Sequence, residues 1–501
     1  MFQRLRTVTP ALLFACVTAQ LHAQPTVLVL EDERAEVQVE SAALIRALDS
    51  INPTRISADL HFIACDEMAG RDSPSKEQRI AARFIRHRLQ RLGWLPGAES
   101  GYLHEYGQAL RVLDVERTKL TASVNGEIRT LPLGDAYAFH PMTLADLSVT
   151  GGVVFVGEFD EESLAGYDMK GKWALSHSGS MSWGKRTRLL KEAGACGVLV
   201  TSPLAGEDEM GERCGGYAKD LSTPRLSRGS SSSAAYPYVY MSHAGQRAML
   251  ELAGLEQMPA LGAEIGIQLN EERYADGEAE AKLENVCGFW PGSDPELSEE
   301  VIIVSAHYDH VGIVKETGDV FNGADDNGSG TVGMLALAEA LVEYGPMRRS
   351  VMLIWVSAEE KGLLGSAAWT KDPWLPEGKR PILNLNLDMI GRNAPDQLLI
   401  TPTKDHEAYD FLTQLAEAHA PTEGFTDLGS ADEYWSRSDH RNFYRNLDIP
   451  VCFLFTDVHE DYHKPTDTPD KIDYDKLHRV TRLILRMLDG LQGDTLPSAA
   501  D

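Results

Sequence analysis

The sequence lacks any long apolar run. Beyond its first two dozen residues no stretch of about 18 apolar residues occurs, so no later segment is long enough to cross a bilayer. Cysteine is also scarce, with six in 501 residues, and five remain when Cys16 near the amino terminus is set aside. Five thiols permit at most two internal disulfides. Cys196 and Cys214 form a conceivable pair, although spacing alone does not establish it.

Basic residues are fewer than acidic residues. The chain has 47 lysine and arginine residues against 75 aspartate and glutamate residues, which gives a formal net charge of −28 at pH 7. A chain this acidic repels the phosphate backbone, so nucleic acid is not an expected partner. Hydrophobic residues make up 43% of the composition, which is enough for a folded chain. A chain of 501 residues is too long for one ordinary hydrophobic core, so two domains or a large domain with an insertion are expected.

The first 23 residues resemble a secretory leader. Arg4 and Arg6 precede an apolar stretch that is too short to span a membrane, and small residues surround Ala23. This arrangement is typical of a signal peptide cleaved after Ala23. It predicts an exported protein, periplasmic or extracellular, whose mature part has no transmembrane span. Lipoprotein processing at Cys16 is the alternative, although Phe14 fits a lipobox poorly.

Composition along the remaining chain predicts one main domain interrupted by an insert. The boundaries are 1–23 for the signal peptide, 24–137 and 266–495 for the two parts of the main domain, 138–265 for the insert, and 496–501 for a tail. Helical periodicity predicts helices over 41–54 and 76–92, with Gly93 as the stop. Alternation around Asn125-Gly126 predicts a hairpin over 116–133.

The insert is predicted to be a β-rich α/β domain. Apolar strands such as "GGVVFVG" alternate with helical stretches such as "KRTRLLKEAG", and a polar serine-rich loop separates two of them. No metal-ligand spacing or phosphate-binding glycine loop occurs in it. We therefore interpret the insert as a lid or docking module.

Four apolar runs in the second part of the main domain predict central strands. They are "EEVIIVSAH", "SVMLIWVSAEE", "PILNLNLDMIG" and "IPVCFLFTD". Continuous apolar runs are typical of strands covered on both faces, and helical stretches alternate with them. The pattern predicts an α/β fold with a doubly wound, mostly parallel sheet flanked by helices. Sites in such folds lie beyond the carboxyl ends of the strands.

Each of these strands ends in histidine or carboxylate residues. They are His307, Asp309 and His310 after the first strand, Asp325 and Asp326 in the following loop, Glu359 and Glu360, Asp388, and finally His459 and His463. Each group alone has an ordinary explanation, such as a helix cap or a salt bridge. Together they form a cluster of acids that would repel one another unless cations compensate them.

Imidazole and carboxylate ligands together suit zinc, with cobalt or manganese as possible substitutes. One catalytic zinc takes three protein ligands, and here the candidates are more numerous. Two metals that share a bridging carboxylate fit the number, and hydrolysis by a metal-activated water is the chemistry that this arrangement performs.

The motifs resemble the secreted co-catalytic di-zinc aminopeptidases, zinc exopeptidases related to glutamate carboxypeptidase and the transferrin receptor. The resemblance rests on "SAHYDHVG", "NGADDNGSG", "SAEEKGLLGS", "LDMIGR" and "YHKPTDTPD", which occur in the order that the family has. It covers most of the mature chain and implies that 138–265 is a protease-associated domain and 266–495 the catalytic metallopeptidase domain. It also implies two zinc ions and peptide substrates with a free amino terminus.

The resemblance further assigns a role to individual residues. It implies that Asp325 bridges the two metals, that the peptide between Asp325 and Asp326 is cis, and that Asp309 orients His307. The remaining ligands would be His307 and Asp388 at one metal, and Glu360 and His463 at the other. Glu359 would then be the general base. Tyr462 would stabilise the oxyanion, or would merely pack beside the metal loop.

Three other functions compete with the aminopeptidase. A carboxypeptidase of the same family would need a cation such as Arg392 or Arg437 to hold a terminal carboxylate. A glutaminyl cyclase uses one zinc and lacks the first histidine, which here is His307. A receptor-like binding protein would have lost ligands or the base. The sequence "SRSDHRNF" contains Ser438, Asp439 and His440, but consecutive residues do not form a catalytic triad.

Overall fold

The structure is a computed structural model, and it describes residues 40–140, 144–179, 181–227, 236–277, 279–314, 317–426 and 428–496. The predicted signal peptide, Cys16 and nearly all of the predicted tail lie outside these ranges. The elements named below lie in the unit Ala42–Asp501. Within the described ranges, no helix combines the length and the apolar character that a membrane span requires.

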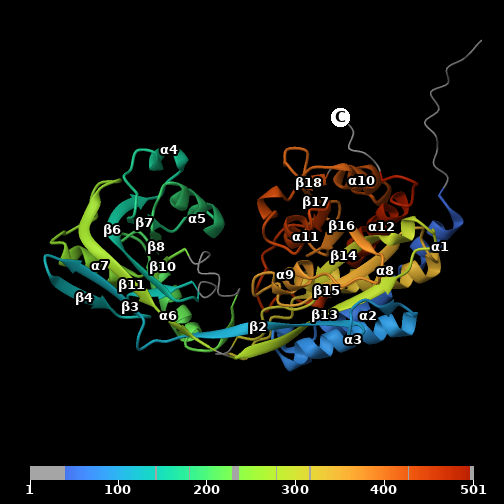
Figure 1. The fold of residues 1–501 in the computed structure, drawn as a ribbon, viewed down its shortest axis with the longest axis horizontal. Coiled ribbons are helices and arrows are strands. Elements are labelled where there is room, and N and C mark those ends of the chain that lie inside the picture. Colours follow the sequence, from blue (N-terminus) through green and yellow to red (C-terminus); the bar gives the residue numbers. More distant parts are fainter. Residues whose placement is uncertain are drawn as a thin grey trace, which may run out of the picture. The chain divides into compact units, whose positions relative to one another are not determined.

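The first sheet has 11 strands and carries the predicted doubly wound arrangement (Figure 1). Its main path runs β12-β2-β13-β15-β14-β16-β19-β17-β18. The strands are β1 (Leu95–Pro96), β2 (Leu103–Leu113), β9 (Arg225–Leu226), β12 (Ala275–Asp276), β13 (Glu280–Trp290), β14 (Glu300–His307), β15 (Ser350–Val356), β16 (Arg380–Leu387), β17 (Leu398–Thr401), β18 (Leu428–Ser430) and β19 (Val451–Phe455). The four predicted central strands are β14, β15, β16 and β19, and each is parallel to its neighbour among them. The predicted α/β fold is confirmed, and the sheet is parallel at its centre, whereas β13 pairs antiparallel with β2 and β15 and β17 pairs antiparallel with β19.

Helices cover both faces of this sheet because successive strand residues point to opposite sides. Ile302 and Val304 of β14 pack with one helical layer, whereas Val301 and Ile303 pack with the other. The first layer contains α1 (Ala42–Ser50), α2 (Pro53–Ile63), α3 (Lys76–Leu92), α8 (Gly330–Tyr344), α10 (Phe411–His419) and α12 (Tyr474–Gly490). The second contains α9 (Leu364–Lys371) and α11 (His440–Leu447). The central strands are therefore buried on both sides.

The helices near the amino terminus match their predictions in part. The range 76–92 is helix α3, and Gly93 ends it with a left-handed φ of 81°. The range 41–54 contains α1 and the start of α2 instead of the single helix that was predicted. Helix α1 ends at Ser50, and Asn52 caps α2, since its side chain accepts from the N–H groups of Thr54 and Arg55.

The second sheet has eight strands in the order β4-β3-β11-β6-β7-β8-β10-β5. They are β3 (Lys119–Val124), β4 (Glu127–Leu131), β5 (Tyr137–Phe139), β6 (Leu147–Gly157), β7 (Trp173–His177), β8 (Gly197–Thr201), β10 (Tyr238–Met241) and β11 (Glu264–Arg273). Helix α7 (His243–Leu252) packs on one face, and α4 (Glu161–Leu164), α5 (Trp183–Glu192) and α6 (Glu209–Leu221) pack on the other. The predicted hairpin is β3-β4, and it belongs to this sheet. The sheet is thus wider than 138–265, and the predicted domain boundaries stay a prediction.

The five cysteines in the described residues are all free. Cys214 is buried and its thiol donates to the carbonyl of Tyr240, so the conceivable pair with Cys196 does not form.

Candidate metal centre

The carboxyl ends of the parallel strands bring a first group of possible metal ligands together. His307 ends β14, Asp388 follows β16, and Asp326 comes from the loop before α8. The Nε2 atom of His307 lies 3.2 Å from Oδ1 of Asp388 and 3.3 Å from Oδ1 of Asp326. All three side chains are buried. Their ligand atoms lie close enough together to hold one metal ion.

A second group lies on the other side of Asp326. Glu360 follows β15, and the Nε2 atom of His463 lies 3.0 Å from Oδ2 of Asp326 and 3.2 Å from Oε2 of Glu360. His310 adds a second imidazole, with its Nδ1 atom 2.9 Å from Oε1 of Glu360. His310, Asp326 and Glu360 also lie close enough together to hold an ion. Asp326 is common to both groups and turns one carboxylate oxygen to each.

The bridging position therefore differs from the prediction by one residue. Asp325 is in neither group. Its Oδ1 atom accepts from the N–H of Gly391 at 2.7 Å, and its Oδ2 atom lies 3.3 Å from Nε2 of His459. The cis peptide joins Asp326 to Asn327, so the expectation of a cis bond between Asp325 and Asp326 was wrong. Two adjacent acids point in different directions, and the local backbone decides which of them faces the strand ends.

The loop that carries Asp326 is held by polar side chains. The carboxylate of Asp467 accepts from the backbone N–H groups of Asp325 and Asp326 at 3.0 to 3.2 Å. The side chain of Asn327 donates to the carbonyl of Leu387 and accepts from the N–H of Met389. The loop is thereby fixed to the residues on both sides of Asp388. This connects the shared carboxylate to the first group.

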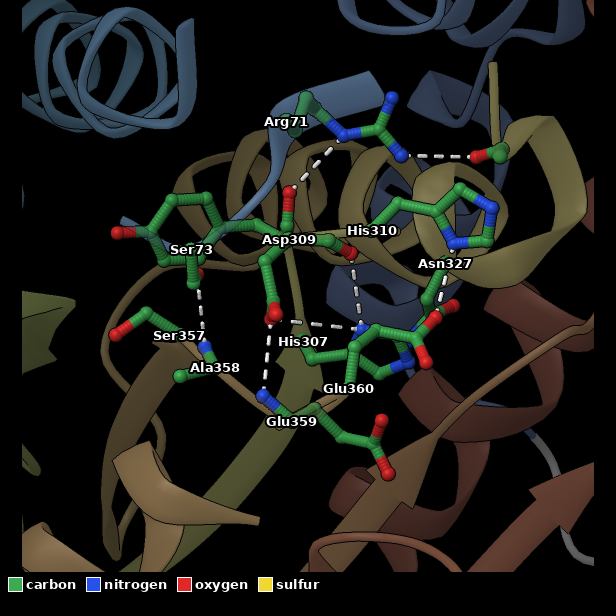
Figure 2. Close-up of polar contacts among 12 residues, drawn as sticks. Arg71, Ser73, His307, Asp309, His310, Asn327, Ser357, Ala358, Glu359 and Glu360 are labelled. Carbon is green, nitrogen blue, oxygen red and sulfur yellow. Dashed lines mark hydrogen bonds and ion pairs between the residues drawn. The ribbon is translucent and has the colours of Figure 1, made fainter. Parts of the chain in front are cut away.

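The ring of His307 is oriented by backbone rather than by the predicted carboxylate. Its Nδ1 atom lies 3.2 Å from the backbone carbonyl of Asp309, which can only accept, so Nδ1 carries the proton and Nε2 is left for a metal. The Asp309 carboxylate is 3.8 Å from the same nitrogen. That carboxylate instead accepts from the backbone N–H of Glu359 at 3.1 Å (Figure 2). Burial raises the pKa of Asp309 to about 7.

The pKa values of the adjacent glutamates are shifted in opposite directions. Burial alone would raise the pKa of Glu360, and Asp326 adds to this rise, but His463 and the hydrogen bond to His310 together hold it below its usual range. The pKa of Glu359 is raised well above its usual range, mainly by burial, with only partial compensation from His307. Glu360 is thus suited to metal binding, whereas Glu359 can hold and release a proton.

Tyr462 and Ser438 lie at the same edge. The hydroxyl of Tyr462 accepts from Arg437 at 3.3 Å, and Ser438 donates to Oδ2 of Asp388 at 2.8 Å. His440 is buried and stacks on Phe453, away from any nucleophile-base arrangement with Ser438. In the described part of the chain, Ser438, Asp439 and His440 therefore form no catalytic triad. Ser438 supports a possible ligand instead.

A small pocket with a partly aromatic lining opens beside Asp388. Its lining residues are Asp388, Met389, Tyr434, Arg437, Ser438, Phe453, Phe455, Val458 and Tyr462. This pocket was not predicted from the sequence, because its aromatic residues come from separate segments. His310 also had no predicted role, although it directly follows Asp309 in the same motif.

The fold and this edge define an α/β protein with a candidate two-metal centre at the carboxyl ends of its strands. Residues 285–488 match the model of peptidase family M28. The matched range contains every residue of both ligand groups.

Relatives of the chain agree with this family. Aminopeptidase YwaD from Bacillus subtilis (strain 168) is 25% identical over 327 residues, which are 63% of this chain and 62% of that protein. A protein named "Probable leucine aminopeptidase" from Trichophyton verrucosum is 28% identical over 200 residues, 38% of this chain and 54% of the relative. The chain thus spans less than two thirds of the length of either relative. The solved structure of an aminopeptidase from Aneurinibacillus sp. strain AM-1 has the same fold, with a TM-score of 0.55 and 22% identity over 91% of this chain and 97% of that one.

Proposed function

We propose that this protein is a two-metal aminopeptidase that removes amino-terminal residues from peptides. One observation carries the proposal: the buried carboxylate of Asp326 turns one oxygen to His307 and the other to His463. This is the position that a bridging ligand needs. The names of the relatives, all aminopeptidases, support the same activity.

The donor set fits two zinc ions. His307, Asp326 and Asp388 would hold one, and Asp326, Glu360 and His463 the other, since zinc accepts imidazole nitrogen and carboxylate oxygen. Three buried carboxylates this close together are costly without cations. Zinc bound there would supply a water of lowered pKa and would polarise the carbonyl of the substrate.

The chain's own residues would then move the proton and stabilise the oxyanion. Glu359 would take a proton from the attacking water and deliver it to the leaving amine, which its raised pKa suits. Tyr462 accepts from Arg437, so its own hydroxyl proton remains to be donated to the oxyanion. Asp309 would hold Glu359 in place through its backbone N–H.

The alternative activities have less support. Of the two cations that a carboxypeptidase would use, Arg392 is already paired with Asp461 at 2.8 Å and lies 3.8 Å from Asp467. A glutaminyl cyclase lacks the first histidine, and His307 lies within the first group. A receptor-like binding protein would not need Glu359 in addition to both ligand groups.

Metal removal tests the proposal directly. We expect the full-length protein with zinc to hydrolyse leucine arylamide, to lose this activity with a chelator, and to regain it with Zn²⁺ or Co²⁺. The amino-acetylated analogue should not be hydrolysed. Metal content measured by atomic emission should return to about two ions per chain. Cleavage of only blocked peptides with a free carboxyl terminus would contradict the aminopeptidase and support the carboxypeptidase.

We further propose that the pocket beside Asp388 accepts an apolar amino-terminal side chain. Val458 lies at its rim and is 36% exposed, so it can be changed with little effect on folding. We expect Val458→Asp to lower kcat/KM for leucine arylamide by about tenfold, and the loss should be smaller for arginine arylamide, whose charge pairs with the new carboxylate.

The matched control for this variant is Ile128→Asp. Ile128 is 69% exposed on β4 of the second sheet and lines neither pocket nor ligand group. It should leave the ratio of the two rates unchanged. An unchanged ratio in Val458→Asp would show that the substrate side chain binds elsewhere.

The proposal also includes export of the protein and an inserted domain. The leader-like residues 1–23 support export, and the second sheet, with helices on both faces, supports a protease-associated domain inserted into the peptidase. Both rest on the sequence pattern and on the sheet's separate cores rather than on the relatives.

A further inference from the structure

A short segment before α3 contacts three of the loops that carry the ligand groups. This segment, residues 69–73, is far from those loops in sequence, and we name it the Arg71 segment. Figure 2 shows Arg71 above the loop of His307 and Ser73 beside the loop of Glu359. No residue of the segment belongs to either ligand group.

The guanidinium of Arg71 is fully buried, and its hydrogen-bond acceptors among the described residues are all backbone carbonyls. Its Nε atom donates to Tyr308, its Nη1 atom to Ile63 and Asn322, and its Nη2 atom to Gly323, at 2.7 to 3.0 Å. Tyr308 directly follows His307, and Asn322 and Gly323 lead into the loop of Asp326. A single planar side chain thus joins two ligand-bearing loops. Lysine has no rigid fork of donors with which to reproduce these bonds.

The backbone of the segment is held in an unusual conformation. Ala69, Gly70 and Arg71 are all left-handed, with φ values of 43°, 63° and 48°. Gly70 also approaches the next loop closely, since a Cβ atom there would lie 2.1 Å from the carbonyl of Gly312. Left-handed residues with side chains are disfavoured and persist where the surroundings determine them, often at functional sites. The contacts of the segment therefore hold its backbone in this conformation.

The third loop is held from the same segment. The hydroxyl of Ser73 accepts from the N–H of Ala358 at 3.2 Å, directly before Glu359. The neighbouring N–H groups are bound by other elements, that of Ser357 by Asn285 at 3.0 Å and that of Glu359 by Asp309. Each of three successive backbone amides thus has a side-chain acceptor from a different part of the chain.

We propose that Arg71 is a positioning residue that sets the distance between the two ligand groups. It acts through the backbone of Tyr308 and Gly323 on His307 and Asp326, and Ser73 extends its segment to the loop of Glu360. Arg71 touches neither a proposed ligand nor the substrate pocket. The inference rests on the proposed two-metal function.

The test measures metal binding by the apoprotein with Co²⁺ alone, by titration and by the visible absorption spectrum. We expect Arg71→Met to weaken at least one Co²⁺ site by tenfold or more and to change the spectrum, which reports ligand geometry. With zinc, kcat should fall about tenfold or more while KM stays within about twofold, because Arg71 contacts no substrate. Arg71→Lys should recover only part of the loss, and Ser73→Ala should show a smaller change.

Arg349→Met is the matched control. Arg349 is also buried and donates to the carbonyls of Leu491 and Gly493 and to Glu300, but it lies at the amino end of β15. We expect this variant to unfold at a lower temperature and to bind Co²⁺ like the wild type. The contrast separates positioning from a general loss of stability.

Wild-type Co²⁺ affinity and spectrum in folded Arg71→Met would overturn the inference. If Arg71→Met does not fold, Arg71→Lys and Ser73→Ala decide by the same readouts, and wild-type values in both would overturn it. A wild-type protein that binds no Co²⁺ would contradict the proposed function itself. The two failures are therefore distinguishable.

Discussion

Replacing Glu359 with glutamine is expected to lower kcat by about a thousandfold while leaving two metal ions bound. Glutamine has nearly the same shape but cannot accept a proton, and general acid-base catalysis contributes about 10²- to 10⁴-fold. Glu359 belongs to neither ligand group, so its neutralisation should not release a metal. Its backbone N–H bond to Asp309 is also unaffected.

The measurement combines kcat on leucine arylamide with metal content by atomic emission. Glu360→Gln serves as the contrast, because the neighbouring side chain lies in the second ligand group and its loss should remove metal as well as activity. A Glu359→Gln protein that keeps full activity with two metals would assign the proton transfer to another residue.

Replacing Asp326 with asparagine is expected to abolish activity and reduce metal content, whereas Asp325→Asn keeps both metals. Asp326 faces both ligand groups, so its loss removes a ligand from each group and weakens the binding of both metal ions. The loss of several kcal/mol of transition-state stabilisation corresponds to about 10³-fold or more in rate. Asparagine at 325 still accepts from the N–H of Gly391, the bond that Asp325 makes at 2.7 Å.

The two variants are compared by Zn²⁺ stoichiometry and by kcat under identical conditions. Because the residues are neighbours, each variant controls for the general effect of removing one acid from the loop. The reverse result, with Asp325→Asn losing metal and Asp326→Asn retaining it, would restore the assignment that the sequence suggests.

The central sheet was predictable because burial on both faces leaves a clear trace in sequence. Strands β14, β15, β16 and β19 are continuous apolar runs, and each ends where a polar residue meets the edge of the sheet. Parallel strands share that edge, so the clustering of His307, Glu360 and Asp388 followed from topology alone.

Features set by local backbone or by distant contacts were not predictable. The choice between Asp325 and Asp326 depends on the turn before α8, which residue types do not encode. Asp467 fixes that turn from more than a hundred residues away, and Asn327 fixes it through contacts with Leu387 and Met389, which lie outside the motif. The proposed role of Arg71 likewise depends on the backbone carbonyls that it binds in the fold. Because every residue has a carbonyl, the sequence does not show which ones Arg71 binds.

The free cysteines make the protein convenient for spectroscopic study. Cys287 and Cys452 are fully buried, and burial raises the pKa of Cys196 to about 11 and that of Cys214 to about 12. Burial also raises the pKa of the partly exposed Cys65. Thiolates rather than thiols react with maleimide labels, so the buried thiols give little background near neutral pH, whereas the accessible Cys65 reacts. Replacing Cys65 alone therefore prepares the described part of the chain for a fluorophore on a cysteine introduced at an exposed position.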